Sequence, residues 1–363
     1  MPLGRQEAST SLETQRECLM DADSKTDHLL STRTTLVLSR SDVEGLVTMA
    51  EVIGEVETAH ADISTGIAAQ PAAIALSLAS SSAAFLAMPA LADRQGLAVV
   101  KLLADIPDNA ARSLPVQRSV VVLVSQETGA PAAIFHGQIP TRIRTAAASA
   151  VATRHLSRPD SRVLGLIGAG ALAVEHVRSH LEVRSIERVL VWSRTTATVA
   201  RFIEQIARDF PKVVVEGAAS PSDVFANSDI VCTLTPSREP VVEGTWFKPG
   251  QHINAVGAPP RPDHREIDSA GMARARVFLD SVDMAMHDSG DLLLAIADGA
   301  ITKDDVAAEL GDVITGVAPG RTSRDDITLF NSVGLAIQDL AICNLLLARA
   351  RQKGVGQEID LAA

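Results

Sequence analysis

The chain has 363 residues, of which 46% are hydrophobic, and a formal net charge of −11 at pH 7. This composition excludes a wholly disordered chain, and so acidic a protein without a basic run is excluded as a nucleic-acid binder. The isolated cysteines Cys18, Cys232 and Cys343 exclude a disulfide framework and a cysteine-bound metal, so we expect buried thiols, no metal site and a reducing compartment, the cytoplasm.

The N-terminal part begins with a polar segment. Residues 1–33 mix acidic and basic side chains and contain no apolar core, which predicts a disordered extension and no secretory signal. Residues 63–92 carry no charge, but Pro71, Pro89 and several serines interrupt them. Because membrane-spanning runs are more uniformly apolar, this stretch predicts the two strands of a hairpin and no membrane partner.

A dinucleotide-binding pattern starts at Val163. The apolar run 163–167 predicts a buried parallel strand, and the run 188–192 predicts a second one. Between them, Gly168-Ala169-Gly170-Ala171-Leu172-Ala173 opens a helical pattern, which is the order of a Rossmann unit. Gly168 would make the tight turn, Gly170 would let a pyrophosphate approach, and Ala173 would keep the helix close to the sheet. The alternative is a structural glycine turn without a ligand.

The end of the second strand indicates which nicotinamide cofactor is bound. An acidic residue about twenty positions after the glycines would hold the ribose of NAD. This chain has Ser193, Arg194 and Thr195 there, and a guanidinium suits a phosphate in charge and geometry. The sequence therefore predicts NADP(H) as the preferred cofactor and NAD(H) as the second choice. The alternative is an arginine that only points to solvent.

Further strands are predicted at 213–215, 229–234, 253–256 and 277–279, with a helix that begins at Thr196. Ligands of parallel sheets lie outside the carboxyl ends of the strands, so Thr233, Val256 and Gly257 should border the cofactor. The apolar pattern of residues 335–346 predicts a helix packed in the core or in a dimer interface.

A family resemblance rests on several segments in order: Thr141-Arg142-Ile143-Arg144-Thr145-Ala146-Ala147-Ala148-Ser149-Ala150, Arg158-Pro159-Asp160-Ser161, Asn254-Ala255-Val256-Gly257, Ser289-Gly290-Asp291 and Ser332-Val333-Gly334. Together they resemble the ornithine cyclodeaminase/mu-crystallin family over about residues 34–352. The resemblance implies an α/β protein with a Rossmann domain at 147–324. It also implies an α+β substrate-binding and dimerisation domain at 34–146 with 325–352, and a homodimer.

The resemblance implies hydride transfer between nicotinamide and the α-carbon of a small amino or imino acid, and it implies the site residues. Lys101 and Arg144 match the substrate-facing cations of the family, and such donors suit an α-carboxylate. Thr145, expected at a helix start, would touch cofactor phosphate, and Ser332 and Gly334 would border the cofactor.

Two departures from the family pattern narrow the function. Position 73, where the family commonly has a carboxylate-binding arginine, is Ala73, and prolines 259 and 260 stand where deaminating members carry an acid. Because reduction of a protonated imine needs no strong base, we predict an NADP(H)-dependent reductase of a small ketimine or imino acid. Two alternatives stay open: an NAD-dependent ornithine or lysine cyclodeaminase, which is an ammonia-lyase, and a non-catalytic NADP-dependent binding protein.

Overall fold

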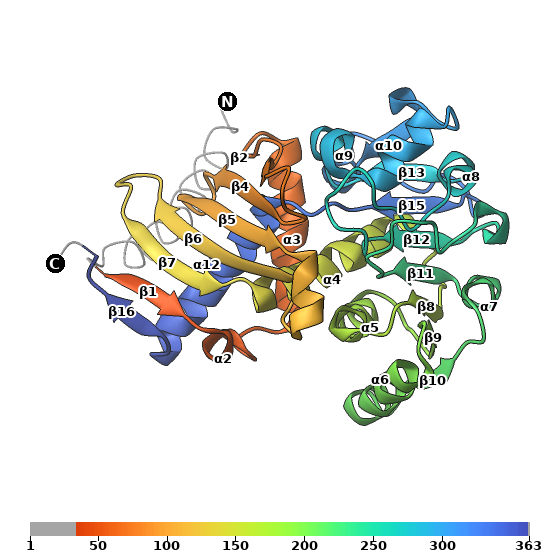
Figure 1. The fold of residues 1–363 in the computed structure, drawn as a ribbon, viewed down its shortest axis with the longest axis horizontal. Helices are drawn as coiled ribbons and strands as arrows, with labels where there is room; N and C mark the ends of the chain where they lie inside the picture. Colours follow the sequence, from red (N-terminus) through yellow and green to blue (C-terminus); the bar gives the residue numbers. More distant parts are fainter. Residues whose placement is uncertain (1–33, 362–363) are drawn as a thin grey trace, which may run out of the picture.

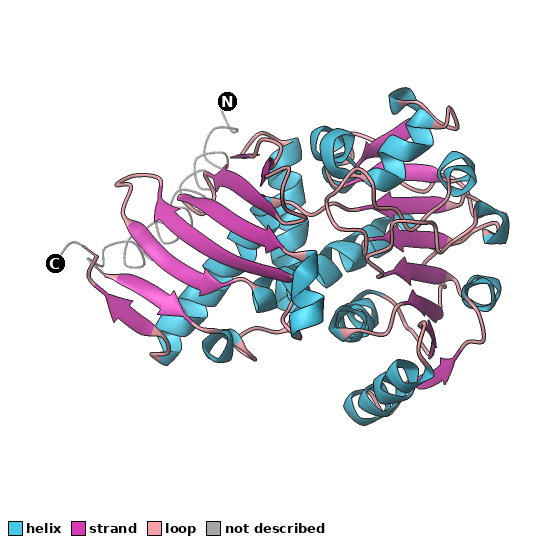
Figure 2. Ribbon diagram, in the orientation of Figure 1, coloured by secondary structure: helices cyan, strands magenta, loops and turns pink. Residues whose placement is uncertain are grey.

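The computed structural model describes residues 34–361 and has two lobes, each built on an eight-stranded sheet (Figure 1). Figure 2 shows the helices that flank these two sheets. The expected extension 1–33 and Cys18 lie outside the described residues. Within residues 34–361, no helix is both long and apolar enough to span a membrane.

The first sheet is mixed, with the strand order β16-β1-β7-β6-β5-β4-β2 and with β3 paired to β4. Helix α12 (Ala336–Lys353) packs on β4, β5 and β6, and α3 (Met49–Ser64) packs on α12 (Figure 1). The β3–β4 pair confirms the hairpin expected in the uncharged stretch, whose first residues belong to α3 instead. The strands are β1 (Thr35–Leu38), β2 (Ala68–Ala69), β3 (Ile74–Ser77), β4 (Ala84–Ala92), β5 (Leu97–Asp105), β6 (Gln117–Ser125), β7 (Pro131–His136) and β16 (Gln357–Ile359).

The second sheet is entirely parallel, with the order β10-β9-β8-β11-β12-β15-β13-β14. The chain order reverses beside β8, which confirms the doubly wound Rossmann arrangement. The strands are β8 (Val163–Ile167), β9 (Arg188–Trp192), β10 (Val214–Gly217), β11 (Ile230–Thr233), β12 (His252–Ala255), β13 (Arg276–Leu279), β14 (Val306–Glu309) and β15 (Thr328–Asn331). The helices of this lobe include α5 (Ala171–Val183), α6 (Thr196–Asp209), α7 (Pro221–Asn227), α8 (Ser269–Arg274), α9 (Val282–Asp288), α10 (Gly290–Ala297) and α11 (Leu310–Thr315).

The apolar run of β8 is explained by burial on both faces. Leu164, Leu166 and Ile167 have no exposed surface. Gly165 faces α7 so closely that an added Cβ would lie 2.5 Å from Val224 Cγ1, so a glycine is needed for the helix to reach the sheet. Burial on both faces is why the segment shows a continuous apolar run and no alternation.

Helix α4 (Gln138–Leu156) passes from the first lobe to the second (Figure 1). This helix crosses the expected domain boundary at 146/147. We had expected Thr145 at the start of a helix, but α4 begins at Gln138, so Thr145 lies inside it. Another difference concerns β15, which falls in the segment 325–352 expected in the first domain. The structure places β15 between β12 and β13 of the second sheet, a pairing that no local pattern of four residues can reveal.

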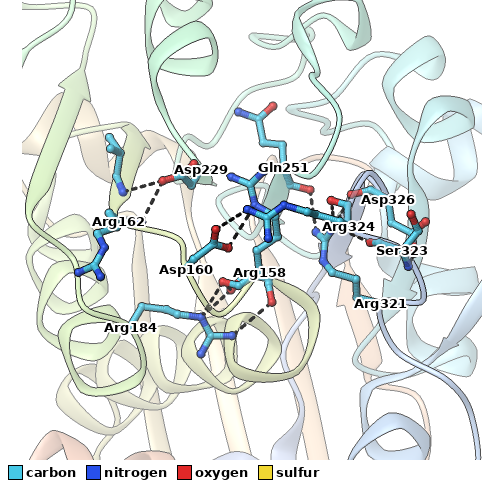
Figure 3. Close-up of polar contacts among 12 residues, drawn as sticks. Arg158, Asp160, Arg162, Arg184, Asp229, Gln251, Arg321, Ser323, Arg324 and Asp326 are labelled. Carbon is cyan, nitrogen blue, oxygen red and sulfur yellow. Dashed lines mark hydrogen bonds and ion pairs between the residues drawn. The ribbon is translucent and has the colours of Figure 1, made fainter.

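A cluster of arginine and acidic side chains lies at the C-terminal end of α4, where this helix meets the second lobe (Figure 3). Arg184 donates to the carbonyls of Thr153 and Arg154 at 2.8 and 2.9 Å, and Arg321 donates to that of Leu156 at 2.7 Å. These cations satisfy the last carbonyls of α4 and oppose the negative end of its dipole. The cluster therefore fixes the angle at which α4 enters the second lobe, at the helix end remote from Arg144.

Candidate active site

A cavity of about 620 Å³ lies between the two lobes. One wall consists of β4, β5, β6 and the first turns of α4, and the other consists of the loops after β11, β12 and β15. Those loops follow the carboxyl ends of parallel strands, where ligands of such sheets bind. Of the predicted site residues, the cavity wall includes Lys101, Arg144, Thr145, Val256, Gly257, Ser332 and Gly334.

Lys101 and Arg144 reach the same carboxylate although they come from β5 and α4. Lys101 Nζ donates to Asp339 Oδ2 at 3.0 Å, and Arg144 Nε lies 3.6 Å from Asp339 Oδ1. Lys101 is 1% exposed and Asp339 is fully buried. Two buried cations thus share one anion, and the excess positive charge can be balanced by the carboxylate of a bound substrate.

The acidity of Lys101 reflects its burial. Removal from water lowers the pKa of its ammonium to about 8, an effect that Asp339 opposes and the positive charge of Arg144 increases. Near neutral pH the side chain therefore keeps its proton but releases it more readily than an ordinary lysine. A lysine of this kind can bind a carboxylate and can also deliver a proton.

The glycine turn fits a dinucleotide pyrophosphate. Gly168 has φ +116°, which favours glycine, and an added Cβ would lie 2.9 Å from the carbonyl oxygen of Leu234. Gly170 precedes α5 with open space where a Cβ would stand, and no side chain caps that helix. The first turn of α5 is therefore open to phosphate oxygens, while Ala173 is fully buried, as close packing of helix and sheet requires.

Ser193, Arg194 and Thr195 follow β9 and lead into α6, outside the cavity wall. Arg194 is exposed and has no ion-pair partner within the described residues. Thr195 Oγ1 lies 2.7 Å from Thr198 Oγ1 in the first turn of α6. The region thus offers a hydroxyl-rich turn and an unpaired cation, and its role in cofactor selection stays a prediction.

Thr233 lies beneath the cavity and not in its wall, so its expected contact with the cofactor stays a prediction. Its Oγ1 donates to Glu266 Oε2 at 2.7 Å, and Glu266 also accepts from the backbone N–H groups of Thr235 at 2.6 Å and Gly257 at 2.7 Å. Burial, followed by the charge of Asp291, raises the pKa of Glu266 to about 7. Sequence reasoning missed Glu266, which ties together the ends of β11 and β12.

Arg261 and Asp105 connect the two lobes at the cavity. Arg261 Nε donates to Asp105 Oδ2 at 2.6 Å, and its Nη2 donates to the carbonyl of Ser82 at 3.2 Å. Sequence reasoning missed this pair because its members are 156 residues apart in different domains. The consequence is that Asp105, an acid in the cavity wall, is already neutralised by an arginine.

The two departures from the family pattern differ in their position. Pro259 and Pro260 line the cavity, whereas Ala73 is not part of its wall and donates its N–H to Met284 Sδ at 3.2 Å. The nearby Asp263 is 59% exposed and bonds its neighbour His264 at 2.8 Å. At the positions where deaminating members of the family carry an acid, this chain therefore presents two prolines to the cavity.

Comparison with known proteins agrees with this geometry. The model of the ornithine cyclodeaminase/mu-crystallin family matches residues 33–354. The chain is 33% identical over 326 residues to a Delta(1)-pyrroline-2-carboxylate reductase of Bacillus cereus, covering 90% of this chain and 99% of the relative. The structure is similar to Thermococcus litoralis Delta(1)-pyrroline-2-carboxylate reductase in complex with NADH and L-proline, with TM-score 0.85, 35% identity, and 90% and 100% of the two chains covered.

It is also similar to an archaeal alanine dehydrogenase dimer with bound NAD, with TM-score 0.85, 32% identity, and 90% and 99% of the two chains covered. Each of these three similarities covers 90% of this chain. The chain belongs to the ornithine cyclodeaminase/mu-crystallin family, as its motifs indicated.

Proposed function

We propose that this protein is an NAD(P)H-dependent reductase that converts a small cyclic ketimine carboxylate, of the pyrroline-2-carboxylate type, into an amino acid. The observation that carries the proposal is the buried pair Lys101 and Arg144, which lines the cavity and shares the carboxylate of Asp339. The similarity to two pyrroline-2-carboxylate reductases supports the same substrate class.

In the proposed reaction the bound nicotinamide supplies the hydride. Arg144 binds the substrate carboxylate, because it lines the cavity and its Nη2 makes no hydrogen bond within residues 34–361. Lys101 Nζ holds a proton near the imine nitrogen and keeps the imine electrophilic. Asp339 holds Nζ at 3.0 Å and so fixes the direction from which the proton is delivered.

The side chains around the cavity favour reduction of an imine over cyclodeamination of ornithine or lysine. A diamine substrate needs a free carboxylate for its second ammonium group, but Asp105 is paired with Arg261 at 2.6 Å. Asp339 is already bonded to Lys101, and prolines 259 and 260 replace the acid expected in deaminating members. The buried cation pair also argues against a binding protein without a substrate, since such a pair is costly without an anion to bind.

We also infer a preference for NADP(H). Arg194 supports this inference because it is exposed, unpaired within the described residues, and placed directly after β9. Its guanidinium suits a ribose 2′-phosphate, and an adjacent acid that would repel the phosphate is absent from residues 193–195. The isolated cysteines keep a reducing compartment, the cytoplasm, as the prediction for location.

The test is oxidation of NADPH and NADH, followed by absorbance, with pyrroline-2-carboxylate, piperideine-2-carboxylate, and pyruvate or glyoxylate with ammonia or methylamine. We expect turnover of the cyclic imines, with NADPH preferred. The R194Q variant should lower the ratio of kcat/KM for NADPH to that for NADH by about 10- to 100-fold, as loss of a charge-assisted contact does. The control is R188Q at the opposite end of β9.

Different outcomes separate the candidate functions. Release of ammonia from ornithine or lysine with NAD, without imine reduction, would establish the cyclodeaminase. Turnover confined to pyruvate with ammonia would place the activity with the alanine dehydrogenases. Cofactor binding without any turnover would support the binding protein, and an unchanged cofactor ratio in R194Q would contradict the role of Arg194.

A second copy of the chain is the partner that we propose, in keeping with the dimeric alanine dehydrogenase. The first sheet presents an apolar face that no described helix covers, opposite the face on which α12 packs. A face of this kind is typical of an oligomer interface.

A further inference from the structure

The guanidinium of Arg144 is held at two of its nitrogens, and the third is left without a hydrogen bond. Its Nη1 donates to Gln338 Oε1 at 2.9 Å and its buried Nε lies 3.6 Å from Asp339 Oδ1, whereas Nη2 has no hydrogen bond within residues 34–361. Gly334, with φ +86°, lies so close that an added Cβ would stand 2.6 Å from Nη1. The backbone of Gly334 and the amide of Gln338 therefore define where the guanidinium sits, and Nη2 is left for a ligand.

The amide of Gln338 has a defined orientation. An arginine can only donate, so the atom that faces Arg144 Nη1 must be the amide oxygen, which also accepts from the N–H of Leu335 at 3.4 Å. The NH₂ end then points the other way and lies 3.0 Å from His60 Nε2. Because an amide NH₂ can only donate, His60 must accept at Nε2 and carry its proton on Nδ1.

His60 is suited to this role by its surroundings. It lies on α3, is 1% exposed, and its burial followed by the charge of Arg144 lowers the pKa of its imidazole to about 4. A neutral imidazole is therefore kept as an acceptor at neutral pH. Protonated His60 would present a donor to the NH₂ of Gln338, and the amide could no longer offer its oxygen to Arg144 in the same arrangement.

We propose that His60 and Gln338 are positioning residues, and that the relay His60–Gln338–Arg144 holds the guanidinium in the orientation that binds the substrate carboxylate. The proposal rests on the proposed function, because it takes Arg144 as the carboxylate anchor. All three side chains are at least nine-tenths buried and come from α3, α12 and α4, so three separate helices determine the orientation of one anchor. Fixing a long side chain before binding removes an entropic cost of binding.

The test compares imine reduction by Q338M, H60L and H60Q with that by the wild type. Q338M keeps the side-chain length but removes the acceptor, and we expect the KM for pyrroline-2-carboxylate to rise about 10-fold with kcat within about threefold. H60L removes the acceptor for the amide and should raise the same KM about 3- to 10-fold, whereas H60Q, whose carbonyl can accept from Gln338, should restore it. The KM for the nicotinamide cofactor should stay unchanged in all three variants.

V56A is the control for lost packing. Val56 is fully buried on the same helix, one turn before His60, and its hydrocarbon side chain can form no hydrogen bond with the relay. V56A should lower stability without changing the KM for the imine. In the double variant H60L/Q338M the KM should equal that of Q338M, because the relay is already broken at Gln338.

Direct binding separates this proposal from the proposed function. Calorimetric titration of the cofactor-loaded protein with pyrrole-2-carboxylate should rank the variants by affinity in the order that their KM values predict. The wild type and H60Q should bind this ligand most tightly. Three outcomes would overturn the relay. The first is a KM and an affinity of Q338M and H60L that change no more than those of V56A. The others are an H60Q variant that binds no better than H60L, and a loss of activity confined to kcat. Carboxylate binding by a wild type that reduces no imine would refute only the reductase function, and absence of both would refute both.

Discussion

We propose that Lys101 carries the proton in this reaction, because two opposing effects act on its ammonium group. Burial at 1% exposure disfavours the charge, and the carboxylate of Asp339 at 3.0 Å favours it. The balance lowers the pKa of Lys101 to about 8. At neutral pH the group is therefore charged and can hold an anion, although its proton is more available than that of an exposed lysine.

The residue-scale prediction is a pH dependence of kcat/KM for the imine. Lys101 loses its proton as the pH rises through about 8, so kcat/KM should be constant below that value and fall above it. In D339N the carboxylate that favours the charged lysine is gone, so the fall should begin at a lower pH. The measurement is a pH profile of both proteins, with D298N, which changes an exposed acid, as the control.

K101M completes this test. Loss of the cation and of the proton donor should reduce kcat/KM by about 10²- to 10⁴-fold, which is typical for a positioned acid. A profile of D339N that coincides with that of the wild type, or a K101M variant with nearly full activity, would show that Lys101 does not carry the proton.

At the scale of elements, a polar network joins α4, α5, β12 and β15 in the second lobe. His180 Nε2 lies 3.1 Å from Thr153 Oγ1, His176 Nε2 lies 3.0 Å from Ser149 Oγ, and His252 Nδ1 lies 3.0 Å from Thr328 Oγ1. All three histidines have no exposed surface. Such a network satisfies the buried polar groups only while the imidazoles are neutral.

This network predicts a loss of stability in acid. Burial lowers the pKa of His176 to about 4 and that of His180 to about 3, and it lowers the pKa of His252 well below 6.5. Because the unfolded chain takes up these protons first, the contribution of the neutral imidazoles to stability is complete above pH 6.5 and is lost as the pH falls below it. One pH unit below 6.5, each histidine should lower the unfolding free energy by about 1.4 kcal/mol.

Denaturant unfolding of the wild type and of H180Q at about pH 7.5 and about pH 5.5 isolates the contribution of one imidazole, since His60 and Glu266 titrate in the same range in both proteins. H180Q removes one titrating group, so between these two pH values its unfolding free energy should fall by about 1.4 kcal/mol less than that of the wild type. H287Q changes an exposed histidine that bonds the carbonyl of Asp283, and it should leave the pH dependence unchanged. An H180Q variant as acid-sensitive as the wild type would contradict the assignment of the loss to the network.

At the scale of the whole molecule, one face of the first sheet is covered by no described helix. The register of β3, β4, β5 and β6 places its apolar side chains on the same face. They are between 37% and 62% exposed: Ile74, Leu76, Phe85, Leu91, Val100, Leu102 and Val120. A second copy of the chain would remove these side chains from water.

This face predicts that the protein is a dimer and that a charge within the face dissociates it. L102K places an ammonium at the centre of the face and should shift the mass measured by light scattering from twice the chain mass to the chain mass. V214K adds the same charge to a 55% exposed valine of β10 in the other lobe and should leave the dimer intact. A monomeric wild type, or equal dissociation by V214K, would refute this interface.

The local pattern of the chain determined the Rossmann unit. The run at β8, the glycines 168 and 170 and the start of α5 follow from contacts within about thirty residues, so composition and spacing were sufficient to predict them. The motif around Arg144 likewise identified the family, and the family resemblance then identified Lys101 as a candidate site residue. The fold class could therefore be predicted from the amino-acid sequence alone, and so could two cations that line the cavity, Lys101 and Arg144.

Only the tertiary structure decided what these cations touch. Asp339 lies 238 residues from Lys101 along the chain, and Gln338 lies 194 residues from Arg144. His60 is further still, 278 residues from the glutamine that it contacts. Arg261 and Asp105 meet across two domains, and β15 enters the second sheet without a local signal. Each is a contact between segments distant in sequence, which side-chain periodicity does not encode, because periodicity reports which face is buried and not what lies against it.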